Sequence, residues 1–354
     1  MRPILKPGLG RVWLDANTVQ LGRGAHCRIH RLDSAERLLL EALDGTRDTD
    51  SLLSYAARLG LSAERSMALL NRLALEGVLD DASLETPALA RVSVAERARL
   101  GPLVSALGLR NKLPGSGARA LERRAQQHVA VHGLGLIGAQ VARQLAAAGV
   151  GVVRPVDPNP GEHRDTGPGA LDPGQAGQRR QDSVCRSIQR DTPFARIAPA
   201  HAARRPELVV VAPVDRYPVE LFDSLAADGV PHLLVRSAGD EVLIGPLVLP
   251  GSTPCVHCAD LRLSETDPSW AQYLAQYGAP RTGELPPGDT SLLLLAAAYT
   301  VHYALTRLDG GDPPVLGAVT SLRPPDAVPV RIELSAHAGC GCGARANAHP
   351  ADLL

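Results

Sequence analysis

The chain has 354 residues, 45% of them hydrophobic, and its 37 basic residues equal its 37 acidic ones. This balance is typical of a soluble protein of about two domains, and it argues against intrinsic disorder and against a basic nucleic-acid binder. The first residues lack the apolar stretch of a signal peptide, and the longest apolar run, 292–305, is shorter than the roughly 20 residues that span a bilayer. We therefore expect a cytoplasmic protein without membrane contact, in which this run forms a buried helix.

The first 81 residues predict a small α+β module. Short strands are expected within 11–31, where apolar and polar residues alternate around a turn. Three helices follow: the first begins with Asp33 and Glu36 in capping-box spacing, the second covers 49–59, and the third runs from Ser62 to Gly77. Three short helices flanked by small strands are typical of a winged-helix-like fold, which we assign to 1–81.

The charge of this module indicates what kind of partner it takes. Residues 1–81 hold eleven Lys or Arg and eleven Asp or Glu. A protein that reads duplex DNA neutralises several phosphates with a basic face, and this module has no net charge with which to do so. The balance favours a peptide or protein partner over nucleic acid.

The rest of the chain predicts a helical linker over 82–126, a second domain over 127–345 and a tail over 346–354. Apolar strands alternate with helical stretches such as 139–148 and 218–228, which predicts a Rossmann-type α/β domain with parallel strands. The strands are expected at 129–132, 150–156, 208–212 and 232–235. The segment 159–181 is rich in Gly, Pro, Asp and Arg without periodicity, and we expect a mobile loop near a nucleotide.

A glycine-rich loop opens the second domain. Gly133, Gly135 and Gly138 lie between an expected strand and an expected helix, where they allow a tight turn, close approach to phosphate and close helix packing. Asp157 follows Gly138 by 19 residues, at the end of the next apolar run, where a carboxylate can bind a ribose hydroxyl. The loop predicts nucleotide binding and leaves ATP and a dinucleotide both open.

Four cysteines form two tight pairs. Cys255 and Cys258 make a C-x-x-C, and Cys340 and Cys342 make a C-x-C after 81 intervening residues. Four thiolates complete the tetrahedral shell of a structural zinc ion, so we expect these four residues to bind one Zn²⁺, with His257 and His337 as neighbours only. Of the other two cysteines, Cys27 is expected to pack in a strand, and Cys185 is interpreted as a small hydrophobic residue.

These residues resemble the ThiF superfamily, which is related to ubiquitin-activating enzymes. The resemblance covers about 127–345 and rests on GLGLIG at 133–138, Asp157, LVVVAPVDRYP at 208–218, CVHC at 255–258 and CGC at 340–342. It implies adenylation of the C-terminal carboxylate of a small protein, with ATP and Mg²⁺ as cofactors, and a homodimer. Asp215 matches the position of the family's metal-binding aspartate.

The chain departs from the family at the ATP phosphates. Active members carry an Arg and a Lys after the Asp157-like carboxylate, and these clamp the phosphates. This chain has no lysine after Lys112. The arginines that follow can replace the lysine only in part, because a guanidinium differs from an ammonium in geometry. They are Arg164, Arg179, Arg180 and Arg186.

The combined architecture resembles the partner proteins of azoline-forming cyclodehydratases. There the N-terminal module, a RiPP recognition element, binds a precursor's leader peptide, and a separate YcaO-type enzyme performs the ATP chemistry. By this resemblance the leader would bind along Cys27–Arg31 and the third helix around Arg65–Arg72, while Met67, Leu70 and Leu73 of that helix face the core.

We therefore expect a leader-peptide-binding scaffold. Two alternatives stay open at this stage: an ATP-dependent adenylyltransferase acting on a peptide or small-protein carboxylate, and an NAD-dependent oxidoreductase.

Overall fold

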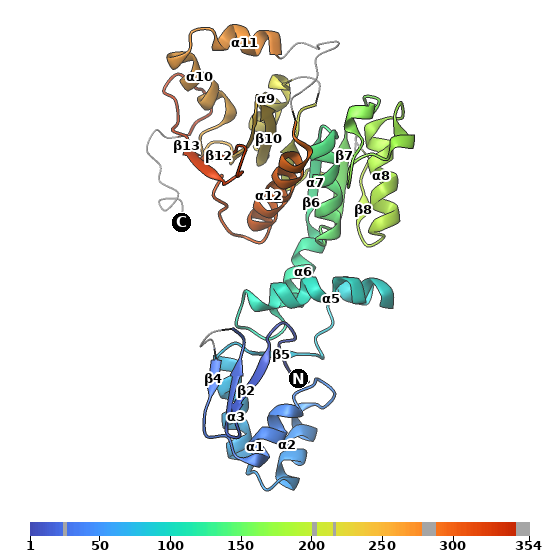
Figure 1. The fold of residues 1–354 in the computed structure, drawn as a ribbon, viewed down its shortest axis with the longest axis vertical. Coiled ribbons are helices and arrows are strands. Elements are labelled where there is room, and N and C mark those ends of the chain that lie inside the picture. Colours follow the sequence, from blue (N-terminus) through green and yellow to red (C-terminus); the bar gives the residue numbers. More distant parts are fainter. Residues whose placement is uncertain (24–26, 200–203, 215–216, 278–287, 345–354) are drawn as a thin grey trace. The chain divides into compact units, whose positions relative to one another are not determined.

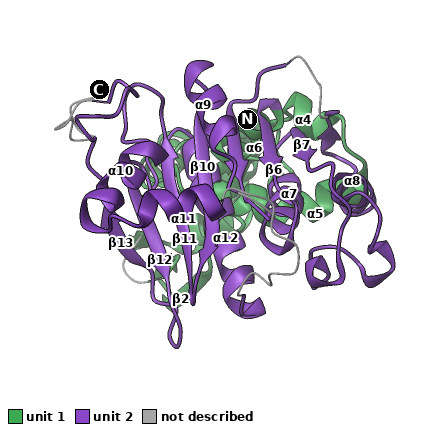
Figure 2. Ribbon diagram, turned by 90° about the horizontal axis from the view of Figure 1, so that it is seen from above, with its two compact units in different colours: residues 1–125 green, residues 126–354 purple. Residues whose placement is uncertain are grey.

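A computed structural model describes residues 1–354 apart from 24–26, 200–203, 215–216, 278–287 and 345–354. The chain divides into two compact units, 1–125 and 126–354, coloured separately in Figure 2. Asp215, the expected metal-binding aspartate, lies outside the described residues.

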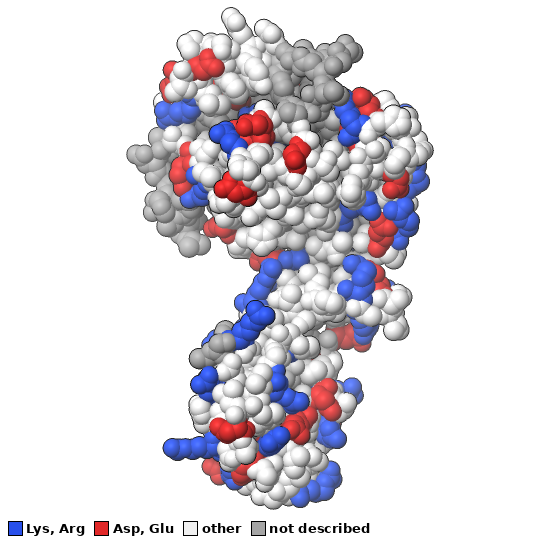
Figure 3. Space-filling model, viewed as in Figure 1, with Lys and Arg blue, Asp and Glu red and all other residues white. Residues whose placement is uncertain are grey.

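The first unit contains two small antiparallel sheets. Strands β2 (Arg11–Asp15), β3 (Thr18–Leu21) and β4 (Cys27–Ile29) pair in the order β2-β3-β4, which leaves β4 at one edge. The other sheet pairs β1 (Pro3–Leu5) with β5 (Leu79–Asp81). Acidic and basic side chains are interspersed over the visible face of this unit (Figure 3), as its neutral charge leads one to expect.

Three capped helices complete the core of this unit: α1 (Ser34–Glu41), α2 (Thr49–Arg58) and α3 (Ala63–Leu75). The predicted capping box is present, since the Asp33 carboxylate accepts the Glu36 N–H and the Glu36 carboxylate accepts the Asp33 N–H. The side chains of Asp48 and Ser62 cap the next two helices with one bond each, accepting the N–H of Ser51 and of Arg65. Apolar residues of all three helices share one core with β3 and β4.

The segment expected as a helical linker is helical: α4 (Pro87–Ala90), α5 (Val94–Leu109) and α6 (Ser116–Gln126). Lys6 ties the end of α5 to the rest of the first unit. Lys6 is 3% exposed, and its ammonium donates to the carbonyl oxygens of Gly108 at 2.8 Å and Asn111 at 2.5 Å. Burial lowers the pKa of Lys6 below its ordinary value.

The second unit is built on one eight-stranded sheet of order β13-β12-β11-β10-β9-β6-β7-β8 (Figure 1). The five strands from β10 to β8 pair in parallel, which confirms the expected Rossmann-type arrangement. They are β6 (His128–His132), β7 (Val152–Val156), β8 (Arg196–Ile197), β9 (Leu208–Val211) and β10 (His232–Ala238). The antiparallel part was not predicted; it consists of β11 (Glu241–Val248), β12 (Ala318–Leu322) and β13 (Val330–Glu333).

Helices form cores on both faces of this sheet. Three of them share one apolar core: α7 (Leu136–Ala147), α8 (Arg180–Asp191) and α12 (Thr290–Leu308). A second core contains residues of α9 (Val219–Ala227), α10 (Val256–Thr266) and α11 (Trp270–Tyr277). By length and composition alone α12 could cross a membrane, but Ala296, Ala297 and Ala304 are fully buried against the sheet, as expected for a core helix.

Candidate functional site

Glycine is sterically required at two positions of the loop between β6 and α7. Gly133 has φ +82°, and a Cβ there would lie 2.0 Å from the carbonyl oxygen of Ala212. A Cβ at Gly138 would lie 1.8 Å from the carbonyl oxygen of Gly133. Both glycines therefore permit a turn and a helix–loop contact that any side chain would prevent.

Gly135 caps α7 at the end where backbone N–H groups and the helix dipole attract an anion. The chain's own side chains lie beside it. A Cβ at Gly135 would be 3.0 Å from Val214 Cγ2 and 3.4 Å from a carboxylate oxygen of Asp165. The negative charge next to this helix end is thus supplied by the protein itself.

A buried network of charges holds that carboxylate in place. Arg180, 1% exposed, donates from Nε to Asp165 Oδ2 at 2.8 Å, and its Nη1 lies 3.5 Å from Asp157 Oδ2. Asp157 Oδ2 also accepts the N–H of Leu134, within the glycine loop, at 2.9 Å. Asp157, the expected ribose ligand, is 5% exposed and fastens the loop to Arg180. Sequence reasoning singled out Asp157 and Arg180 but missed Asp165, because no local pattern pairs residues 15 positions apart.

Of the four arginines that could replace the missing clamp lysine, three are engaged within the protein, while Arg179 is exposed. Arg180 is bound between two carboxylates, and Arg164 pairs with Glu162 at 2.9 Å. Arg186 donates to Gln178 and to Ser183. Because Asp165 lies beside Gly135, a phosphate at this helix end would meet a carboxylate of the protein.

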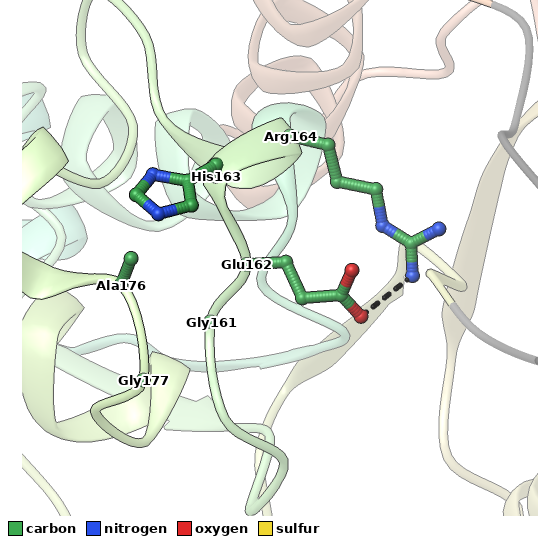
Figure 4. A pocket seen from close by; sticks show the side chains of 6 residues that line it. All are labelled: Gly161, Glu162, His163, Arg164, Ala176 and Gly177. Atoms are coloured by element: carbon green, nitrogen blue, oxygen red, sulfur yellow. Dashed lines mark hydrogen bonds and ion pairs between the residues drawn. The ribbon is translucent and has the colours of Figure 1, made fainter. Parts of the chain in front are cut away.

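The segment expected as a mobile loop is folded back on itself. Gly161 donates its N–H to the carbonyl of Gln178, and Gly177 donates to the carbonyl of Gly161, both at 2.7 Å. It contains two short 3₁₀ turns, at His163–Asp165 and Pro173–Gln175. A pocket of about 570 Å³ lies on this segment, and Figure 4 shows the side chains that line it. Its lining residues are Gly161, Glu162, His163, Arg164, Ala176 and Gly177.

The four paired cysteines meet at one point, with sulfur atoms all within 4.8 Å of one another. The Cys255–Cys258, Cys255–Cys340 and Cys258–Cys342 sulfur pairs are 3.8, 3.6 and 3.5 Å apart. Ligands about 2.3 Å from a tetrahedral zinc ion would be about 3.8 Å apart, so the spacing fits the metal, whereas a disulfide would be about 2.05 Å. The four cysteines could hold one metal ion.

The surroundings of the cysteines favour thiolates around a cation. Cys255 precedes the first turn of α10 and Cys258 lies in it, where the helix dipole favours negative charge. The His337 N–H points to Cys258 Sγ at 3.4 Å. Burial raises the pKa of the Cys255 thiol and so disfavours the thiolate. A bound cation would favour the thiolate again. His257 and His337 direct their Nε2 atoms to Asp223 and Glu265, at 2.8 and 2.9 Å.

The strip expected to bind peptide consists of β4 and α3 in the first unit. Arg72 of α3 donates to the carbonyl oxygen of Arg28 in β4 at 3.3 Å, so the two elements are adjacent. Leu70 and Leu73 are buried as expected, but Met67 is 36% exposed, and its expected place in the core is wrong. At the end of β4 lies an open polar pocket of about 690 Å³, lined by Asp15, Asn17, Thr18, His30, Arg31 and Asp33.

Solved structures with the same architecture match nearly the whole chain. A structure of E. coli MccB with succinimide has a TM-score of 0.66 and 13% identity, and the match covers 97% of this chain and 99% of that one. The chain has the fold of MccB. PaaA matches with a TM-score of 0.67 and 16% identity over 92% of this chain and 98% of that chain. No family model and no curated protein matches the sequence, so the likeness to MccB and PaaA is one of fold.

Proposed function

We propose that the protein is a ThiF-like scaffold that binds the leader of a ribosomal precursor peptide and presents it to a separate YcaO-type cyclodehydratase. One observation favours a scaffold over an enzyme: Asp165 lies beside the N-terminal end of α7, where an anion would bind, and Arg180 holds Asp165 in place. No lysine follows Lys112 to clamp phosphates instead. In this proposal the protein is cytoplasmic and homodimeric, and the four cysteines bind a structural Zn²⁺.

Peptide binding is assigned to the winged-helix-like module at 1–81, as a RiPP recognition element. Structures with the same fold support a peptide ligand, since MccB has been solved with MccA and with N-formylated MccA. An extended peptide adds to a sheet edge through backbone hydrogen bonds and needs no strong surface charge. The edge strand β4, beside α3, offers such a position in a unit of balanced charge.

The test is fluorescence anisotropy of the full chain with labelled peptides encoded beside its gene. We expect one leader to bind, and Arg72→Glu to weaken it about tenfold or more by placing a carboxylate beside the β4 backbone. Arg58→Glu, a charge reversal of an exposed residue on α2, is the matched control. If none of these peptides binds, the scaffold proposal fails.

Adenylation is the second candidate, favoured by the MccB structure solved with ATP. It would require the Asp165–Arg180 pair to open. The assay is pyrophosphate exchange from ATP in the presence of the same peptides. Exchange that Asp215→Ala abolishes would replace the scaffold with an adenylyltransferase, whereas quenching of NADH fluorescence would point to the oxidoreductase.

A further inference from the structure

The sheet of the second unit ends in an exposed strand with apolar residues on one face. β13 has β12 on one side only (Figure 1), and all four of its residues are exposed. Val330 is 57% and Ile332 is 47% exposed, and both lie on the same face because side chains alternate along a strand. The opposite edge, β8, has only two residues and offers little backbone for pairing.

The backbone of β13 presents hydrogen-bonding groups outward at two positions. Leu334 donates its N–H to the carbonyl of Gly317, so its backbone points toward β12. Along an antiparallel strand the pointing direction alternates, hence Val330 and Ile332 also point toward β12, while Arg331 and Glu333 point away from the sheet. Among the described residues no strand lies beside these outward groups.

We propose that two copies of the chain pair through β13, antiparallel, about a two-fold axis at Ile332. Arg331 then lies opposite Glu333 of the partner subunit, and their outward N–H and C=O groups form the two backbone hydrogen bonds of a close pair. Ile332 meets its own counterpart in the non-hydrogen-bonded pair, where side chains approach most closely. Val330 falls opposite Leu334 of the partner subunit. Each charged residue thereby lies opposite a residue of opposite charge, and the dimer contains two such pairs.

Other registers are worse, which favours a second copy over an arbitrary strand. An axis at Arg331 would place two guanidinium groups opposite each other, and an axis at Glu333 would do the same with two carboxylates. Pro329, the residue before β13, has no N–H and ends the pairing at one side. The sequence VRIEL at 330–334 is thus self-complementary in one register.

The pairing specifies the interface of the homodimer that the proposed function includes, and it does not depend on peptide binding. A short strand pair with few flanking side chains falls below the roughly 1,200 Å² of a tight interface, so we expect a dissociation constant of about micromolar. Because the axis is two-fold and β8 is too short to extend the sheet, assembly stops at the dimer.

Sedimentation velocity of the full, metal-loaded chain over about two decades of concentration tests the surface. We expect a monomer–dimer equilibrium that Ile332→Lys shifts about tenfold or more toward monomer, because two ammonium groups would meet at the axis. Val94→Lys, at a residue that is 87% exposed on α5, is the matched control and should leave the equilibrium unchanged. A monomeric wild type, or a dimer that Ile332→Lys leaves intact, overturns the proposal.

A mixing experiment separates pairing between chains from the ion pair between Arg331 and Glu333 within one chain. Arg331→Glu and Glu333→Arg should each be monomeric alone, because each sets like charges opposite each other. Mixed together they should form a heterodimer, since every cross-strand pair is again of opposite sign while neither chain regains its internal pair. Failure of the mixture to dimerise counts against this register. Neither measurement uses a peptide, so its failure and that of the leader-binding assay are distinguishable.

Discussion

Arg180 shares one positive charge between two buried carboxylates, Asp157 and Asp165. Each partner contributes something different to the glycine loop. Asp157 accepts the Leu134 N–H directly, while Asp165 lies beside Gly135 at the start of α7. Removing the arginine would leave two buried carboxylates without the cation that they share.

We expect Arg180→Met to lower the free energy of unfolding by about 3–5 kcal/mol, the cost of breaking a buried ion pair from one side. Urea denaturation followed by circular dichroism measures this loss. Arg179→Met, at the exposed neighbouring residue, should change stability by less than about 0.5 kcal/mol. Equal effects of the two substitutions would mean that the network does not stabilise the fold.

His132 is a half-buried titratable residue near the loop, at the end of β6. Burial, with the charge of Arg154, lowers its pKa from 6.5 to about 4. The unfolded chain therefore binds a proton at a higher pH than the folded chain does. Stability from this residue is complete above about pH 6.5 and is lost as the pH falls toward 4.

Between pH 7 and pH 5 the wild type should lose about 2 kcal/mol more of unfolding free energy than His132→Gln does. The measurement is urea denaturation at both pH values, taken as the difference between the two proteins. His302→Gln, at an exposed position of α12, is the control and should keep the wild-type pH dependence. If His132→Gln leaves the pH dependence of the unfolding free energy unchanged, the lowered pKa of His132 is contradicted.

Among the secondary-structure elements, those with local signals were predictable from the sequence. The capping box at Asp33 and Glu36 located α1, and the apolar runs located β6, β7, β9 and β10. In the second unit the antiparallel strands β11, β12 and β13 were missed. β13, for example, alternates Val330 and Ile332 with Arg331 and Glu333, yet all four are exposed, so the alternation does not mark a buried face.

The candidate sites divide in the same way. The cysteine spacing indicated a four-sulfur cluster because each pair lies within one short segment, and the structure brings the pairs together. The charge network around Asp157 could not be predicted, since Asp165 and Val214 reach the glycine loop only through the folding of intervening segments.

The cysteine cluster joins the N-terminus of α10 to the segment around 336–343, two elements far apart in the sequence. We expect one zinc ion per chain by elemental analysis and its loss in Cys258→Ser, whose sulfur is fully buried in the cluster. Cys185→Ser, outside the cluster, should retain the metal. Metal retained by Cys258→Ser, or absent from the wild type, would rule out the assignment.

Across the whole molecule, the two units carry one tryptophan each, Trp13 on β2 and Trp270 on α11. The guanidinium of Arg37 lies over the Trp13 ring, with its Cζ atom 4.3 Å from the ring centroid. Trp270 stacks on Tyr273 and donates to Asp260, on the helices that follow the cysteine pair. Each ring therefore reports the unfolding of its own unit.

A chelator should lower the thermal midpoint seen by Trp270 and leave that seen by Trp13 in place, because only the second unit contains the four-cysteine cluster. Fluorescence melts of Trp13→Phe and Trp270→Phe, each with one remaining tryptophan, measure the two midpoints separately. Cys258→Ser should reproduce the chelator's effect without chelator. Equal shifts at both rings would show that the units unfold as one.

The burial of Lys6 has a practical consequence for chemical modification. The chain has two lysines, and the ammonium of Lys6 is bound to two carbonyl groups in the interior of the first unit. Amine-directed reagents are thus left with the exposed Lys112 and the terminal amine of Met1, both in residues 1–125. An ordinary succinimidyl dye should therefore label the first unit alone and leave the Rossmann-type unit unmodified.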